Sequence, residues 1–384
     1  MTTFDPIFVP RAVRDAVSDE AWIVAMLDAE RALAAAESKV GVIPAQPAAA
    51  IVDACKRGDF DVDAILEQAR AVGNPAEPLV RALRTRVGEE AARWVHFGAT
   101  SQDVVDTAAM LVARNAVGLI TEEIGGANAA CAALAEAHRD TPMAGRTLLQ
   151  QAVPTTFGAK AAGWLLALAA PCEDLRSYRF LAQLGGAAGT LAALGDRGPD
   201  VLRAYAAELD LDAPTLPWHA FRRPWAMLGA LLDASAGGCA KVGLDVILLS
   251  QTEVGEVAEG DGGGSSTMPH KRNPVRATRA RACARLVHAN ASVLAATEHE
   301  HERAAGAWHA EWTALSESLA HAGGAAAAIR ECLDGLEVDP ERMQDNMRDD
   351  LYSERDRLGI DDAAYLGSAG TFVDAALARY RARA

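Results

Sequence analysis

Long proline-free intervals with a helical repeat of apolar residues constrain this chain most. Proline is absent from 79–141, 172–198, 225–268 and 275–339, and each interval exceeds the average helix of about 11–12 residues. In the third interval, apolar side chains recur at spacings of three and four or their sums, which places them on one helix face. They are Leu228, Leu231, Leu232, Cys239, Val242, Val246 and Leu249. This pattern predicts a long helix of a bundle.

Similar alanine-rich stretches cover about 103–139, 157–183 and 275–330, and no run shows the alternation of a strand. The sequence therefore predicts an all-α fold. Helices of about 30 residues would be roughly 45 Å long, which is more than a compact monomer of this size needs. We therefore expect bundling between subunits.

Breaks in composition divide the chain into three parts. We expect an N-terminal helical domain over 1–100, a central domain of long bundled helices over 101–335, and a short C-terminal helical lobe over 336–384.

Composition excludes several classes of protein. The 384 residues are 50% apolar and carry a net charge of −15, which argues against disorder and against nucleic acid or an anionic membrane as the main partner. The six cysteines are far apart, as expected of core residues in a reducing cytoplasm. The N-terminal residues lack the pattern of a signal peptide, and the most apolar window, 161–170, is too short to span a bilayer.

Three segments differ from the helical pattern around them. They are WVHFGATSQD at 94–103 (first segment), GRTLLQQAVPTTFG at 145–158 (second segment) and GDGGGSSTMPHKRNP at 260–274 (third segment). In the third, small residues precede a cationic cluster, which is a plausible design for a lid over an anion site. Taken alone, such a stretch is also typical of a linker. A phosphate-binding loop is excluded because the G-x-x-x-x-G-K-[ST] order is absent.

The run GSSTMPHKRNP at 264–274 resembles the signature loop of the fumarase/aspartase/adenylosuccinate lyase superfamily, and the other two segments follow in that superfamily's order. Further stretches are most similar to its bacterial branch that cyclises 3-carboxy-cis,cis-muconate in the protocatechuate branch of aromatic catabolism. They are FGATSQD, GRTLLQ, LGGAAGTLAALG, PWHAFR, QTEVGEVAEG and ERAAGAWHAEW.

The resemblance implies a homotetramer in which three subunits contribute one segment each to every active site. It implies that Ser265 moves the proton at the carbon beside a carboxylate, and that Lys271 and Asn273 stabilise the resulting intermediate. Substrate contacts are implied or expected for Thr100, Ser101, Gln102, Thr147, Gln150, Met268, Arg303 and His309. His96 is a further catalytic candidate, although a structural role for it weighs equally.

Two departures from the superfamily concern its usual charged pair. Many members carry a histidine after the threonine of the second segment and a glutamate five residues after the signature asparagine. Leu148 and Thr278 stand there instead. Cyclisation needs this pair less than hydration does, because the substrate's own carboxylate is the nucleophile.

We expect no metal, no cofactor and a small tricarboxylate substrate. The histidines of EHEHER at 298–303 lack metal-ligand spacing and are expected on a solvated helix face. Two alternatives remain: a β-eliminating lyase that releases fumarate or a related diacid, and a catalytically silent scaffold. The intact Ser265, Lys271 and Asn273 count against the scaffold.

Overall fold

The computed structural model describes residues 3–56, 60–260, 263–264, 268, 271–361 and 365–383. In these residues the fold is mostly helical, which confirms the all-α class. Its helices are α1 (Asp5–Phe8), α2 (Arg11–Ala16), α3 (Asp19–Val40), α4 (Ala45–Ala54), α5 (Val62–Val72), α6 (Ala76–Arg86), α7 (Glu89–Ala92), α8 (Ser101–Ala137), α9 (Phe157–Arg176), α10 (Gly198–Glu208), α11 (Arg223–Leu249), α12 (Val275–Leu294), α13 (Ala307–Asp334), α14 (Pro340–Asp345), α15 (Ser353–Leu358) and α16 (Ala369–Arg381), with 3₁₀ turns η1 (Ala192–Arg197) and η2 (Asp349–Tyr352).

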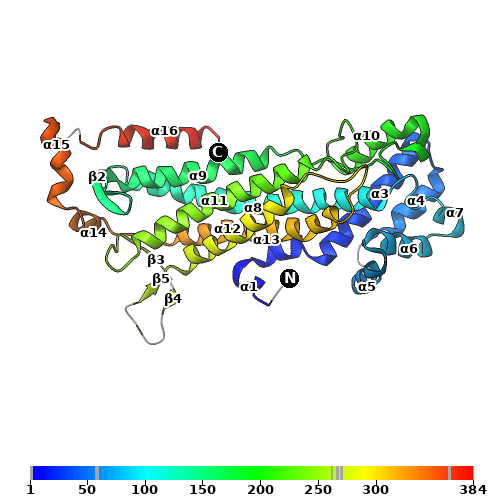
Figure 1. Cartoon of the computed structure of the whole chain (residues 1–384), viewed down its shortest axis with the longest axis horizontal. Coiled ribbons are helices and arrows are strands. Elements are labelled where there is room, and N and C mark those ends of the chain that lie inside the picture. Colours follow the sequence, from blue (N-terminus) through cyan, green and yellow to red (C-terminus); the bar gives the residue numbers. More distant parts are fainter. Residues whose placement is uncertain are drawn as a thin grey trace.

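The core is a bundle of α8, α9, α11, α12 and α13, which run side by side along the long axis of the molecule (Figure 1). Small residues allow their backbones to approach closely. At Gly238 of α11, an added Cβ would lie 2.5 Å from the carbonyl oxygen of Ala167 on α9. The apolar face predicted between 228 and 249 is largely buried in this bundle.

Helix α8 is long and apolar enough to cross a membrane by length and composition, but 78% of its apolar window is buried inside the protein. This burial is the pattern of a core helix. All six cysteines are buried and unpaired with one another, which confirms their expected place in the core.

Short strands, which were not predicted, interrupt the helical pattern. They are β1 (Pro142–Thr147), β2 (Gln150–Thr156), β3 (Val257–Glu259), β4 (Gly263–Gly264), β5 (Arg272–Asn273) and β6 (Leu336–Val338). They form three antiparallel pairs, β1–β2, β3–β6 and β4–β5. The second segment therefore contains the turn and the second strand of a hairpin, and the third segment contains the β4–β5 pair.

Two predicted helices end earlier than expected. The stretch 275–330 is broken between α12 and α13, because tertiary contacts such as a backbone bridge from Glu298 to Phe221 hold the chain away from helical geometry. Helix α9 ends at Arg176, and the following residues bridge Leu181 to Asp212. Helical periodicity does not reveal such contacts.

Most of the smaller helices lie at the two ends of the bundle, whereas α1 lies beside its middle and contacts α12 and α13 (Figure 1). Helices α4–α7 lie at one end together with α10, which packs against α3. At the opposite end are the β1–β2 hairpin, the β4–β5 pair, α14 and α15, and α16 returns along α9. The domain limits at 100 and 335 stay a prediction.

Candidate active site

The first segment ends where α8 begins. Thr100 is the N-cap residue, and its N–H donates to Asp103 Oδ2 at 3.0 Å. Such a cap satisfies an N–H at the helix start and leaves the positive end of the helix dipole at Ser101. A helix of 37 residues thus presents its N-terminus at one end of the bundle.

Asp103 is buried and organises a neighbouring turn. Its two carboxylate oxygens accept the N–H groups of Gly185 and Gly186 at 2.8 and 2.9 Å. Oδ1 also lies 2.7 Å from His219 Nε2. His219 is itself buried. Asp103 thereby holds the start of the turn that contains the Gly186 and Ala187 carbonyls.

Those carbonyls hold Arg303. Its Nη2 donates to Gly186 O at 3.2 Å and to Ala187 O at 2.8 Å, while its Nη1 contacts Thr100 Oγ1. The structure therefore brings together two predicted substrate-binding residues that are 203 positions apart in sequence. A half-buried guanidinium beside a hydroxyl is suited to binding a carboxylate.

The side chain of Gln102 lies in the core. It is fully buried, and its Nε2 donates to Asp106 Oδ2 at 3.2 Å and to the carbonyl of His219 at 3.0 Å. Asp106 also accepts from the buried Arg222 at 2.7 and 2.9 Å, and Arg222 in turn pairs with Glu311 at 2.6 Å. This charged network lies beneath the first segment.

His96 and Ser101 line a cavity of about 240 Å³ together with residues of α6. His96 has a left-handed backbone (φ 59°), and its Nδ1 lies 2.5 Å from Oε1 of the buried Glu30 on α3. Burial acts to lower the pKa of His96, but the charge and hydrogen bond of Glu30 outweigh it and the net pKa is raised. Glu30 was not predicted as a functional residue, although a carboxylate on the apolar face of the 19–40 helix is a signal that the sequence contains.

The histidines near 300 differ in environment. The side chain of His299 is 1% exposed, with Nε2 3.3 Å from Glu311 Oε1, so the expectation of a solvated helix face was wrong for it. The backbone there is not helical, because Arg303 and Glu298 are held by other parts of the fold. His309 is exposed and packs against Trp308 and Trp312, with ring centroids 5.1 and 4.9 Å away.

The second segment forms the tip of the β1–β2 hairpin. Thr147 pairs with Gln150 across the turn, and both are exposed. Between them Leu148 and Leu149 have left-handed backbones (φ 50° and 63°) and are 97% and 75% exposed. Exposed leucines in this conformation are unusual.

In the third segment, Ser265 lies outside the described residues. Strand β5 carries Asn273, which is half-buried, while Lys271 and Met268 are exposed. The N–H of Lys271 donates to the Met268 carbonyl at 3.0 Å. The segment is anchored behind β5 by Glu259, which is buried and accepts the N–H groups of Arg276 and Ala277 at 3.0 and 2.8 Å.

The first segment lies at the opposite end of the bundle from the other two (Figure 1). Helix α8, with 37 residues, separates Ser101 from the hairpin by about 55 Å. Within one chain, the structure thus joins Arg303 with Thr100 and His96 with Ser101, but it does not bring Thr147, Gln150, Lys271 or Asn273 to them.

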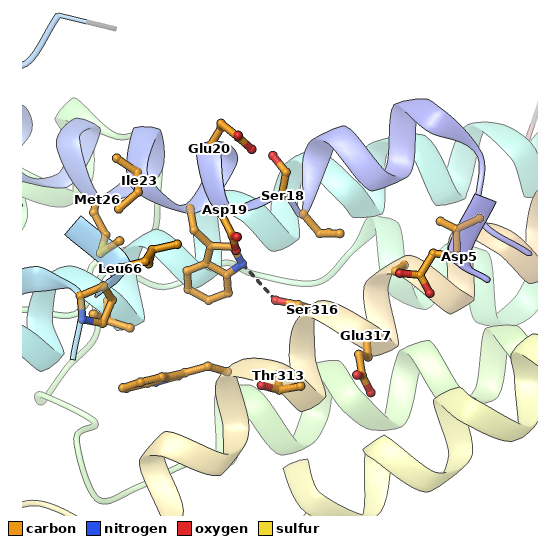
Figure 2. A pocket seen from close by; sticks show the side chains of 17 residues that line it. Asp5, Ser18, Asp19, Glu20, Ile23, Met26, Leu66, Thr313, Ser316 and Glu317 are labelled. Atoms are coloured by element: carbon orange, nitrogen blue, oxygen red, sulfur yellow. Dashed lines mark hydrogen bonds between the residues drawn. The ribbon is translucent and has the colours of Figure 1, made fainter. Parts of the chain in front are cut away.

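Another cavity, of about 600 Å³, lies between α3 and α13 (Figure 2). Trp22, Met26 and Trp312 contribute its apolar wall, and Trp22 Nε1 donates to Ser316 Oγ at 3.0 Å. Its charged lining residues are all acidic: Asp5, Asp19, Glu20 and Glu317. This charge disfavours a polycarboxylate ligand, so we do not assign the predicted site to it.

The chain is similar to a known family and to several known proteins. The model of a family described as Lyase matches residues 10–288. The chain is 47% identical over 360 residues to the 3-carboxy-cis,cis-muconate cycloisomerase of Bradyrhizobium diazoefficiens, covering 90% of this chain and 80% of that protein. It is also 47% identical over 362 residues to the nitrosuccinate lyase of Streptomyces davaonensis, covering 89% and 76%. The crystal structure of 3-carboxy-cis,cis-muconate lactonizing enzyme from Pseudomonas putida superposes with a TM-score of 0.92 at 36% identity, covering 99% of both chains.

Proposed function

We propose, from the premise that this chain belongs to the Lyase family, that it is a cycloisomerase converting 3-carboxy-cis,cis-muconate to a carboxymuconolactone. The observation that carries the proposal is the exposed Leu148 at the hairpin tip, where many superfamily members have a histidine. A leucine can neither activate water nor transfer a proton, whereas an intramolecular carboxylate needs no activation. Relatives with this activity, at 47% and 44% identity, support the assignment.

The reaction forms one C–O bond and consumes one C=C bond. A carboxylate oxygen of the substrate adds to an alkene carbon, and the electron pair of the double bond moves onto the carbon beside another carboxylate. That carbon then takes up one proton, so the product is an isomer of the protonated substrate. The chemistry as written uses no cofactor, and the protein must orient the chain and stabilise the intermediate charge.

The predicted residues have distinct parts in this scheme. Lys271 and Asn273 would stabilise the negative charge that develops on carboxylate oxygens, and Ser265 would return the proton. Thr100 with Arg303 would hold a carboxylate that does not react, because their contact presents a cation beside a hydroxyl at the start of α8. Thr147, Gln150 and Met268 would complete the substrate contacts.

We infer further that the site is assembled between copies of the chain. The argument rests on the roughly 55 Å of helix α8 between the first segment and the hairpin, since α8 has 37 residues. No bending of loops closes such a gap within one chain. A homotetramer acting on a small tricarboxylate in the cytoplasm, without nucleic acid or membrane, is the assembly that we propose.

A second candidate is a β-eliminating lyase that releases fumarate or a related diacid. The observation in its favour is the relative named nitrosuccinate lyase, which is as identical to this chain as the cycloisomerase of Bradyrhizobium diazoefficiens. Against it, the histidine and glutamate positions of the superfamily are Leu148 and Thr278.

One assay separates the two candidates. Purified protein is mixed with 3-carboxy-cis,cis-muconate or with nitrosuccinate, with a chelator present, beside Ser265→Ala. We expect rapid loss of the conjugated diene absorbance, insensitive to the chelator and abolished in Ser265→Ala. Fumarate formation from nitrosuccinate with an unchanged diene would replace the cycloisomerase by the lyase.

A further inference from the structure

We propose that His96, Arg84 and Ser101 form a subsite for the carboxylate that distinguishes a tricarboxylate from a dicarboxylate, and that Glu30 is the positioning residue of His96. The inference rests on the proposed function, because it specifies which substrates that site accepts. It adds Glu30 and Arg84, two residues outside the three segments.

The orientation of His96 is set from two sides. Its left-handed backbone (φ 59°) is costly for a residue with a side chain, and such strain persists only where the surroundings impose it. The surroundings here include Glu30, whose Oε1 lies 2.5 Å from Nδ1. Because Nδ1 is engaged, the Nε2 edge is the part of the ring that remains for a ligand in the cavity.

Glu30 has the environment of a positioning carboxylate. It lies on the buried face of α3, and its side chain is fully buried. Its second oxygen, Oε2, has no hydrogen-bond partner among the described residues. A buried carboxylate with one bond is expensive unless its partner is a cation, so this pairing favours a protonated His96.

The cavity beside His96 is suited to an anion. It has a volume of about 240 Å³ and is lined by Glu77, Val80, Arg81, Arg84, His96 and Ser101. Arg84 Nη2 donates to the carbonyl of Val95 at 3.2 Å, which holds its guanidinium beside the first segment. Ser101 adds the N-terminus of α8, whose dipole favours negative charge. Among these described lining residues the acidic one is Glu77, and Arg81 lies 3.7 Å from it and balances its charge.

The groups that face His96 determine its pH response. Glu30 on α3 and Asp103 on α8 favour the charged ring, whereas burial and Arg84 on α6 oppose it, and the net pKa is raised. The ring therefore stays protonated to a higher pH than an ordinary histidine, and anion binding should be lost as the pH rises through that raised pKa.

Two neighbouring residues of the first segment thus lie beside two different cationic groups. Thr100 contacts Arg303, and Ser101 borders the cavity with His96 and Arg84. A substrate with an additional carboxylate can use both environments, whereas a dicarboxylate leaves one of them empty. This difference makes the cavity a selectivity site.

Calorimetry with non-reacting ligands tests the subsite at pH 7. Tricarballylate carries three carboxylates, and glutarate carries two. We expect Arg84→Gln to weaken tricarballylate binding about tenfold, because a charge-assisted hydrogen bond is lost, and to leave glutarate binding within about twofold. Arg70→Gln removes an exposed arginine of α5 that does not line the cavity and is the matched control.

The pH profile tests Glu30 separately. In Glu30→Gln, the midpoint at which tricarballylate binding weakens should move down by about one pH unit or more, since a nearby opposite charge shifts a pKa by that amount. Glu37→Gln changes another buried glutamate of the same helix and should leave this midpoint in place. Arg84 is exposed, so Arg84→Gln remains informative if Glu30→Gln fails to fold.

The outcomes for subsite and function are distinct. Unchanged tricarballylate affinity in Arg84→Gln, an equal loss for glutarate, or no tricarballylate binding by the unmodified protein overturns the subsite. If the unmodified protein consumes the diene and Arg84→Gln binds tricarballylate as tightly as the unmodified protein does, the proposed function stands and the subsite is refuted. If the unmodified protein binds tricarballylate through Arg84 but leaves the diene intact, the subsite stands and the proposed function is refuted.

Discussion

Arg146 donates to both carboxylate oxygens of Glu256, at 2.6 and 3.0 Å. Glu256 is fully buried and also accepts from Asn346 Nδ2 at 2.9 Å. The pair joins the β1–β2 hairpin to the chain that leads through β3 into the third segment. Two predicted segments are therefore mechanically coupled within each chain, although neither Arg146 nor Glu256 was predicted as a functional residue.

Removing the cation of this pair should destabilise the protein. Arg146→Met leaves Glu256 buried without its charge partner, which costs about 3 kcal/mol of unfolding free energy. Urea denaturation at fixed protein concentration measures the loss. The double variant Arg146→Met/Glu256→Gln should recover part of it, and an unchanged urea midpoint in Arg146→Met would contradict the coupling.

Gly186 and Gly189 offer a matched test of the turn that holds Arg303. Both have left-handed backbones, with φ 69° and 78°, but only at Gly186 would a Cβ collide, 2.8 Å from the carbonyl oxygen of Gly98. Gly189→Ala should lower the free energy of unfolding by about 1 kcal/mol, because of backbone strain alone. Gly186→Ala should lower the free energy of unfolding by more than this. It should also lower kcat/KM, because it displaces the carbonyl that binds Arg303. Equal effects of the two substitutions on stability and kinetics would refute this account.

The leucines at the hairpin tip should matter for activity and not for stability. Asparagine tolerates the left-handed backbone better than leucine, so Leu148→Asn and Leu149→Asn should leave the melting temperature unchanged or slightly raised. The rate of diene consumption should fall if the tip reaches the site of another copy. A marked drop in melting temperature would instead show that these side chains pack as part of the folded core.

Glu37 should make stability depend on pH. Burial, reinforced by the charge of Glu30, raises the pKa of Glu37 to about 9 in the folded protein, from 4.5. The folded state then binds one proton more than the unfolded state between these values, so this contribution to stability is complete below pH 4.5 and is lost as the pH rises through about 9. At pH 7 the free energy of unfolding of Glu37→Gln should therefore exceed that of the original chain by about 3 kcal/mol. If denaturation curves show the same difference in stability between Glu37→Gln and the original chain at pH 5 and at pH 8, this effect is excluded.

Lys271 is the described residue of the third segment on which the proposed chemistry depends most. Lys271→Met should lower kcat/KM by about 100-fold, because it removes a charge that stabilises the intermediate. Lys39→Met, which removes a 65% exposed lysine of α3, is the control. Activity within about threefold of the original in Lys271→Met would assign this stabilisation to another group.

Several properties could be predicted because they depend on residues close in sequence. The helical spacing between 228 and 249 predicted α11, and the absence of proline between 79 and 141 allowed α8. The β1–β2 hairpin escaped prediction, because its register depends on a turn at Leu148 and Leu149 with an unusual backbone. The break between α12 and α13 was not predicted either, because contacts with residues distant in sequence keep that stretch out of helical geometry.

The sequence by itself determined the helical class, the order of the three segments and the family, since periodicity and motifs are local properties. Tertiary structure alone decided which side chains meet. Packing joins Glu30 to His96 across 66 positions and Thr100 to Arg303 across 203, and it turns Gln102 into the core. Pairings of this kind depend on where whole helices lie against one another, which no window of sequence records. The same packing places the first segment one long helix away from the other two.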